Sequence, residues 1–296
     1  MEPDGLMAQK TPFQRWAKRR RNTVLRTLIG LLLALPYTWR VPLCGWVMAY
    51  AIAPFAGYTK RVRENLALIL PDLPEAEVKR MVRAVPRNVG RTLIEIYSGA
   101  EFVARATAEP LKGEGLAALD AAHAAGRPVI LVTGHFGNYD ASRAALIARG
   151  YNVGALYRPM GDKKFNTHYV DAISRIGTPV FPRGRSGLAD MVRFLRSGGM
   201  LGLLIDQHMG HGETLSFFDH PAMTALSAAD LALKYDALVV PTYAVRRANG
   251  LDFEIIIEPP IPHGTAQEMT QALNDSLERL VRKHLDQWFW IHRRWK

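Results

Sequence analysis

Apolar and polar positions follow two different periods along the chain, and from residue 111 onward these periods alternate. Short runs rich in β-branched residues predict buried strands, and stretches with apolar residues every three or four positions predict helices. The predicted strands are residues 128–133, 152–157, 179–181, 200–205, 238–245 and 253–258. The predicted helices are residues 116–125, 141–149, 165–176, 188–195, 226–235 and 267–285. This order predicts an α/β fold with a mainly parallel central sheet flanked by helices, in which the last two strands are close enough to form a hairpin.

Helical spacing also covers much of the segment between residues 72 and 104. We expect Asp72 to cap a helix, with Pro74 near its first turn and Glu75 three residues after the cap. A second helical stretch is expected at about residues 89–104. The sequence shows no internal repeat and no low-complexity tract.

The first 58 residues differ from the rest of the chain. Arg15 and the cluster Lys18-Arg19-Arg20-Arg21 precede two apolar runs, residues 28–35 and 42–58. Neither run reaches the roughly 20 residues of a spanning helix, and the Tyr and Trp residues at their edges are typical of the headgroup level. We therefore expect residues 1–58 to form a membrane anchor, which dips into one leaflet or makes a short helical hairpin. A single span and two buried helices of a soluble domain are the alternatives, and residues 59–296 are expected to form the α/β domain.

Net charge and cysteine content indicate which partners and which cysteine-based sites are possible. The 296 residues carry a net charge of +11, which favours an anionic partner such as nucleic acid, anionic lipid or a phosphorylated substrate. A solubilising basic surface would give the same charge. Because Cys44 is the only cysteine, an intrachain disulfide and a thiolate metal cluster are excluded.

One segment combines a predicted strand end with residues able to move a proton. The strand at 128–133 runs into Gly134, His135 and, five residues after the histidine, Asp140. Ligands of open α/β sheets bind where strands end at their carboxyl side, so His135 is well placed for catalysis. A neutral imidazole takes a proton from a substrate hydroxyl, and a carboxylate at its other ring nitrogen fixes the tautomer.

The spacing of these two residues requires a particular local structure. On a continuous helix, side chains five residues apart point in directions about 140° apart. His135 and Asp140 therefore meet only if the segment is a turn that becomes a helix. Gly134 and Gly137 permit such a turn, and Asn138 is a suitable N-cap. The alternative is a turn histidine followed by an ordinary acid at a helix start.

The run from His135 to Asp140 resembles the His-x4-Asp/Glu motif of the lysophospholipid acyltransferase superfamily. Further blocks resemble one branch, the late acyltransferases of lipid A biosynthesis, which add lauroyl or myristoyl chains. These blocks are Asn65-Leu-Ala-Leu with Pro71, Tyr157-Arg158-Pro159, residues 199–207 ending in Asp206-Gln207, Phe217-Phe218-x-x-Pro221-Ala222, and the terminal residues 287–296. The resemblance covers almost the whole chain from about Arg19. Two positions depart from the branch: Asp140 stands where Glu is frequent, and Asp219 where Gly is expected.

The resemblance implies an O-acyltransferase on the cytoplasmic face of a bacterial inner membrane, without a cofactor or metal. The donor would be an acyl carrier protein thioester, or coenzyme A, and the acceptor a hydroxyl of a lipid A precursor. His135 would be the general base with Asp140 as its partner. We expect Arg158, Asp206, Arg175 and Arg185 to bind substrate, with Asp206 pairing with Arg158 or a nearby backbone group.

Other partners and activities fit the sequence less well. The C-terminal Trp288, Trp290 and Trp295 mix with basic residues, which is typical of a headgroup-level patch on an anionic membrane surface. We do not expect nucleic-acid binding, because an apolar anchor begins the chain. A metal site built from Asp206 and the histidines near it is not expected either. No Gly-x-Ser-x-Gly elbow is present, which disfavours a serine hydrolase. Other lipid acceptors (a lysophospholipid, ornithine lipid or glycolipid) and a non-enzymatic basic membrane-binding protein remain alternatives.

Overall fold

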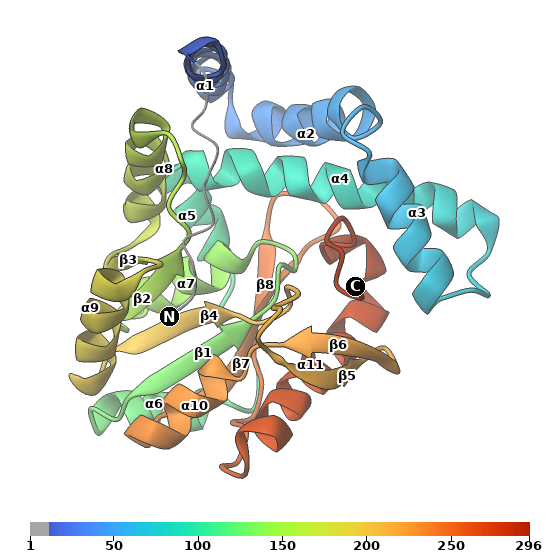
Figure 1. The fold of residues 1–296 in the computed structure, drawn as a ribbon. Helices are drawn as coiled ribbons and strands as arrows, with labels where there is room; N and C mark the ends of the chain where they lie inside the picture. The colour runs from blue at the N-terminus through green and yellow to red at the C-terminus, as the bar shows by residue number, and fades with distance from the viewer. Residues whose placement is uncertain (1–11) are drawn as a thin grey trace.

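The computed structural model describes residues 12–296 (Figure 1). Its helices are α1 (Pro12–Leu33), α2 (Tyr37–Val47), the π-helical turn η1 (Met48–Ile52), α3 (Tyr58–Ile69), α4 (Glu75–Tyr97), α5 (Ala100–Ala106), α6 (Leu116–Ala124), α7 (Tyr139–Ala148), α8 (Lys163–Ile176), α9 (Arg185–Arg196), α10 (Ser227–Tyr235), α11 (Ala266–Lys283) and the short turn η2 (Leu285–Gln287). Its strands are β1 (Val129–Thr133), β2 (Val153–Tyr157), β3 (Val180–Pro182), β4 (Met200–Leu204), β5 (Glu213–Phe217), β6 (His220–Thr224), β7 (Leu238–Arg246) and β8 (Phe253–Ile257).

The six predicted strands form one sheet in the order β3-β2-β4-β1-β7-β8. All neighbours are parallel except β7 and β8, which pair antiparallel as expected for two strands close in sequence. The predicted α/β class and mainly parallel sheet are therefore confirmed. The structure adds a second, two-stranded sheet of β5 and β6, which the sequence did not predict because these strands are mostly polar and partly exposed.

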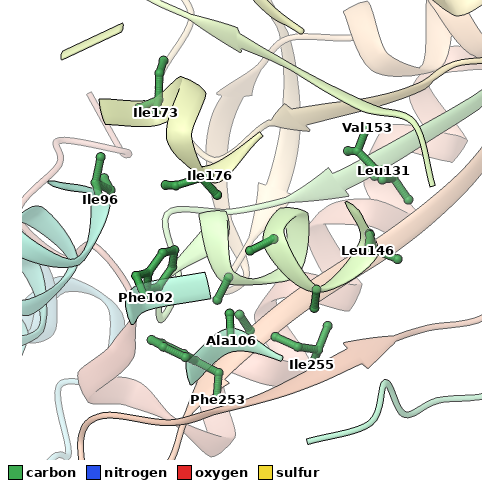
Figure 2. Close-up of a cluster of buried hydrophobic side chains, with 14 of the residues drawn as sticks. Ile96, Phe102, Ala106, Leu131, Leu146, Val153, Ile173, Ile176, Phe253 and Ile255 are labelled. Carbon is green, nitrogen blue, oxygen red and sulfur yellow. The ribbon is translucent and has the colours of Figure 1, made fainter. Parts of the chain in front are cut away.

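Helices cover both faces of the sheet, and the period-two alternation of β1 supplies both cores. Val129 and Leu131 belong to the cluster under α5, α6, α7 and α8, part of which Figure 2 shows. Ile130 and Val132 point to the other face and pack with α9, α10 and α11. β1 is thus buried on both sides, which explains its continuous apolar run.

A third apolar cluster joins α3 and the first half of α4 to the chain's C-terminal end. Trp288 and Trp290 are almost completely buried there, in ring contact with Phe217 and Phe218. Arg294 is also buried and donates to the carbonyl of Met223. The predicted headgroup-level patch at the C-terminus is therefore wrong for Trp288, Trp290 and Arg294. The aromatic and basic residues serve an internal cluster, because π-faces and guanidinium groups pack against one another as well as against lipid.

The helix that precedes the sheet differs from its prediction in two respects. Its N-cap is Pro74, and no side chain caps it, so the expected capping by Asp72 is wrong. One helix, α4, runs through Pro86 as far as Tyr97, and α5 follows as a separate short helix. The predicted stretch at 89–104 therefore spans the end of one helix and most of the next. Gly99, with φ of 54°, provides the break between them.

The N-terminal helices pack on α4 through one face only. Figure 1 shows α2 lying along α4, and Val41 and Ala49 are buried at this contact. The opposite surface is apolar and exposed, with Trp39 68%, Trp46 54% and Phe55 91% accessible. In the described part of residues 1–58, the helices are therefore not fully buried, as the alternative of a soluble domain would require. Among the described residues, no helix has the length and apolar character required to cross a membrane. The side chains of Arg15, Lys18, Arg19 and Arg21 lie outside the described part of the chain.

Candidate active site

Strand register brings His135 to Asp206, although 71 residues separate them in sequence. β1 and β4 are parallel neighbours, and Thr133 at the end of β1 pairs with Leu204 at the end of β4. His135 and Asp206 each stand two residues beyond this pair. Because parallel strands end at the same edge of a sheet, the two side chains meet there.

The Asp206 carboxylate, 2% exposed, accepts hydrogen bonds from three donors. One oxygen lies 2.7 Å from Nδ1 of His135. The other accepts the backbone N–H of His135 at 2.6 Å and the indole Nε1–H of Trp288 at 2.9 Å. Burial raises the pKa of Asp206, but the adjacent imidazole and these donors outweigh it, so the pKa lies below its usual value. The carboxylate is therefore ionised at neutral pH and holds a proton on Nδ1.

The other ring nitrogen of His135 is directed away from the carboxylate. With Nδ1–H donated to Asp206, the Nε2 lone pair is available, and the Gln207 side-chain amide lies 3.3 Å from it. The His135 side chain is 26% exposed and lies between the rings of Tyr139 and Phe289. This imidazole can accept a proton from a bound hydroxyl and later return it.

Two cavities reach His135, and they differ in character. A cavity of about 840 Å³ extends along the sheet edge and includes Arg158 and Arg183 in its lining. A smaller cavity of about 200 Å³ lies toward α4 and is mainly apolar, with Leu93 and Phe289 among its lining residues. His135 and Tyr139 line both cavities. A polar group and a hydrocarbon chain can therefore approach the imidazole from different directions.

The turn after His135 has the predicted form and is tightly held. Gly137 has φ of 52°, and a Cβ there would lie 1.9 Å from the carbonyl oxygen of Ala244. Its own carbonyl accepts hydrogen bonds from Asn88 and Thr92 of α4. Asn138 caps α7 by accepting the N–H of Asp140 at 3.1 Å, which confirms its expected role.

A buried charged network supports this turn, and sequence reasoning missed it. Glu95, fully buried, accepts from Asn138 at 2.8 Å and pairs with both terminal nitrogens of Arg246. Arg246 also donates to Asn88 at 2.7 Å. A carboxylate inside the apolar stretch 93–97 was the available signal, because buried acids require a partner.

Asp140 lies elsewhere than predicted. Its carboxylate pairs with Arg143 at 2.9 Å, and Arg143 also donates to the carbonyls of Ile173 and Gly177 at the end of α8. The expected contact between His135 and Asp140 is absent, and Asp206 occupies that place. The reason is that α7 starts at Tyr139, so Asp140 falls in the first helical turn and faces α8. The catalytic roles of both residues stay predictions.

The predicted substrate-binding arginines separate into two groups. Arg158 is exposed at the end of β2 and lines the larger cavity beside His135. Arg175 on α8 and Arg185 at the start of α9 are also exposed, but neither lines that cavity. Asp206 does not pair with Arg158, whereas its predicted bond to a nearby backbone group is present. Within residues 12–296, no group of three or more His, Cys, Asp or Glu side chains is arranged to hold a metal ion.

At the edge of this mainly parallel sheet, an imidazole is hydrogen-bonded to an ionised carboxylate. This arrangement is typical of enzymes that use general acid–base catalysis. Comparison with known proteins specifies the reaction. Residues 21–296 match the family model for bacterial lipid A biosynthesis acyltransferases, so the chain belongs to that family and is an acyltransferase.

Curated relatives agree at modest identity. A phosphatidylinositol mannoside acyltransferase of Mycobacterium tuberculosis (strain H37Rv) is 24% identical over 98% of this chain and 94% of its own length. A lipid A biosynthesis lauroyltransferase of Escherichia coli (strain K12) is 24% identical over 80% of this chain and 78% of its own. A lipid A biosynthesis acyltransferase of Haemophilus influenzae is also 24% identical, over 79% of this chain and 76% of its own. These relatives support an acyltransferase that acts on lipid acceptors.

Proposed function

We propose that this enzyme transfers a fatty acyl chain from a carrier thioester to a hydroxyl of a lipid A precursor, with His135 as general base and Asp206 as its partner. The observation that supports this most directly is the 2.7 Å contact between Nδ1 of His135 and the buried carboxylate. It directs the other ring nitrogen, Nε2, to the junction of two cavities, where the side-chain amide nitrogen of Gln207 lies 3.3 Å from it and an acceptor hydroxyl would take the place of this amide.

The proposed reaction needs no enzyme nucleophile. Nε2 of His135 removes the proton as the acceptor hydroxyl oxygen attacks the thioester carbonyl. The tetrahedral intermediate then collapses, the carbon–sulfur bond breaks, and the imidazolium returns its proton to the leaving thiolate. Asp206 stabilises the imidazolium throughout, because its negative charge lies against Nδ1–H in a site with little water.

We assign Asp140 a positioning role in place of the predicted direct contact with His135. Its ion pair with Arg143 connects the first turn of α7 to the last turn of α8. That connection holds the segment that follows His135. Asp140 would therefore affect the reaction only through the shape of this turn.

The donor is proposed to be an acyl carrier protein thioester, with coenzyme A as the alternative, and the chain lauroyl or myristoyl. Both carriers end in a phosphopantetheine arm, and Arg158 with Arg183 at the larger cavity suits its phosphate. Arg175 and Arg185 do not line this cavity. For these two we propose only a peripheral role in attracting an anionic carrier.

A second acceptor has specific support. The relative named phosphatidylinositol mannoside acyltransferase aligns with 98% of this chain, whereas the relative named lipid A biosynthesis lauroyltransferase aligns with 80%. A mannosylated phospholipid also offers a hydroxyl on a phosphorylated glycolipid. The same base and the same steps would serve either acceptor.

We place the enzyme on the cytoplasmic face of a bacterial inner membrane. The exposed apolar surface of α2, η1 and the turn that follows η1, which includes Trp39, Trp46 and Phe55, supports docking into one leaflet. Aromatic side chains favour the headgroup level, and a basic sequence before an apolar run favours the cytoplasmic side of the membrane.

The test is acyl transfer followed by mass spectrometry. Membranes containing the protein are incubated with lauroyl or myristoyl carrier protein and the tetra-acylated lipid A precursor, beside parallel reactions with coenzyme A thioesters and with a mannosylated phosphoinositide. We expect the wild-type enzyme to add one acyl group and His135→Ala to add none. Transfer that survives His135→Ala would refute the proposed base, and a gain only on the phosphoinositide would replace the lead acceptor by the second.

A further inference from the structure

A line of basic residues follows one face of α4. Lys79, Arg83, Arg87 and Arg91 are spaced four residues apart, so their side chains form a stripe about 18 Å long. We call these four residues the α4 stripe. Like charges at this spacing destabilise a helix. The stripe therefore costs stability in the unbound enzyme, and an anion bound along it would remove that cost.

Ion pairs within the described residues do not neutralise the α4 stripe. Other cations around it are paired: Arg246 with Glu95, and Arg80 with Glu77. In the described part of the chain, by contrast, no acidic partner lies within ion-pair distance of any α4 stripe residue. These four residues therefore hold charge that an external anion can neutralise.

Arg91 is the α4 stripe residue whose charge and hydrogen-bond donors are least well satisfied. Its Nε is buried and has no hydrogen-bond partner among the described residues. Burial, followed by the neighbouring charges of Arg246 and Arg87, lowers the pKa of Arg91. A buried guanidinium nitrogen without an acceptor is unusual, because burial of an unpaired donor is costly.

The stripe lines a groove and not a flat surface. The groove has a volume of about 720 Å³; seven of its lining residues are basic and one, Asp286, is acidic. Asn88 and Gln287 line both this groove and the small apolar cavity that contains His135. A ligand can therefore place an anionic group between the arginines and extend an apolar part toward the imidazole.

The position of the groove indicates a lipid. Tyr50 of η1 lines it, and the guanidinium groups of Arg83 and Arg87 lie 5.7 and 5.8 Å from the Tyr50 ring centre. The ring of Trp46, more than half exposed, lies 5.6 Å from that of Tyr50. An exposed aromatic edge beside convergent arginines matches the boundary between acyl chains and phosphates in a membrane.

We propose that the α4 stripe binds the phosphate group of the membrane lipid that accepts the acyl chain. This inference rests on the proposed acyl transfer and adds a second anion site to it, separate from Arg158 at the larger cavity. The acceptor enters from the side of α4 with its phosphate in the groove. Its apolar part then lies in the small cavity, and the donor thioester approaches His135 along the sheet edge.

Calorimetry tests the phosphate site without any acyl transfer. The full chain is titrated with dihexanoyl phosphatidic acid below its micelle concentration, beside dihexanoyl phosphatidylcholine and inorganic phosphate. We expect the double variant Arg83→Gln/Arg87→Gln to bind the phosphatidic acid at least about tenfold more weakly than wild type, since hydrogen bonds between charged groups are lost. The matched control Arg193→Gln/Arg196→Gln, two exposed charges on α9, should bind like wild type.

Three results would overturn the inference at this stage: no binding by wild type, equal binding by wild type and the α4 variant, or inorganic phosphate bound as tightly as the lipid. Melting temperatures of both variants that are no lower than that of wild type would show that a loss of affinity is not a loss of folding.

Kinetics then identifies the lipid as the acceptor. With the acyl-transfer assay, Arg83→Gln/Arg87→Gln should raise the KM for a phosphorylated acceptor about tenfold, with kcat and the KM for the donor unchanged. The effect should disappear with a dephosphorylated acceptor. A raised KM for the acyl carrier protein instead would assign the groove to the acidic carrier and refute the proposal. If wild type transfers no acyl group to any acceptor, the proposed function fails, while calorimetry still decides whether the groove binds a lipid phosphate.

Discussion

The variant Asp206→Asn tests whether Asp206 or Asp140 is the carboxylate that assists His135. Asp206 accepts three hydrogen bonds, and the oxygen that faces Trp288 takes two of them. The single oxygen of asparagine satisfies these two donors best, which leaves its NH₂ group against Nδ1 of His135. The imidazole must then carry its proton on Nε2, and it can no longer accept a proton from the acceptor hydroxyl.

The size of the effect follows from the charge that is removed. A carboxylate and an imidazolium about 4 Å apart attract by about 4 kcal/mol at an effective dielectric constant of about 20. Because each 1.36 kcal/mol of barrier is a factor of ten, loss of this attraction lowers kcat by about 10³-fold. The wrong tautomer adds to this loss, so about 10³-fold is the smallest fall we expect for Asp206→Asn.

Asp140→Asn is the matched control, since it changes a carboxylate to an amide five residues from His135. It breaks the buried pair with Arg143, so we expect a loss of about 3–5 kcal/mol of stability. The kcat, per folded enzyme, should stay within about threefold of wild type. Acyl transfer is measured by mass spectrometry at saturating substrates, and folding by thermal unfolding. The reasoning is refuted if Asp206→Asn keeps a tenth or more of the activity, or if folded Asp140→Asn is as inactive as His135→Ala.

Three further predictions concern stability and membrane binding. Gly137→Ala should lower the free energy of unfolding by at least about 3 kcal/mol, because the new Cβ meets a backbone carbonyl at 1.9 Å. Gly126→Ala, with φ of 62° and open space around it, should cost only about 1 kcal/mol; equal melting temperatures for the two variants would contradict this. Burial lowers the pKa of His292 from 6.5 to about 4. The unfolded chain therefore binds this proton first as pH falls, and stability present above pH 6.5 should decline by about 1–2 kcal/mol toward pH 4, after allowance for partial exposure. Chemical denaturation should show that the stability of His292→Gln declines less between pH 6.5 and pH 4 than that of wild type. An equal decline would be evidence against this assignment to His292. Trp39→Ser/Trp46→Ser should weaken binding to phosphatidylglycerol vesicles at least about tenfold in sedimentation assays, and unchanged binding would remove α2 from the docking surface.

Local pattern was sufficient for the sheet and for the position of the histidine. Short runs rich in apolar residues predicted all six strands of the large sheet, and the run is most continuous in β1, which is buried on both faces. His135 was placed correctly at a strand end, and Asn138 at the start of α7. These features depend on neighbouring residues alone, and a single sequence therefore contains them.

Strand order, by contrast, could not be predicted from local sequence pattern. It decides which side chains meet at the site. Asp140 and Asp206 both stand in sequence blocks that resemble the family. Because β1 and β4 are adjacent in the sheet, Asp206, the carboxylate farther from His135 in sequence, is the one that contacts it. The α4 stripe is visible in the sequence as four cations at helical spacing. The groove that it lines is not, because Tyr50 and Gln287 come from distant segments.

The aromatic C-terminus shows the same division. Its composition suited a membrane surface and a buried cluster equally, since both are stabilised by transfer of aromatic area out of water. Packing against Phe217 and Phe218 selected the cluster and turned the indole of Trp288 toward Asp206. The sequence by itself determined the strands of the large sheet, the family and the position of His135 at a strand end. Tertiary structure alone decided which carboxylate faces that histidine and which aromatic surfaces remain exposed, because both depend on contacts between segments far apart in the chain.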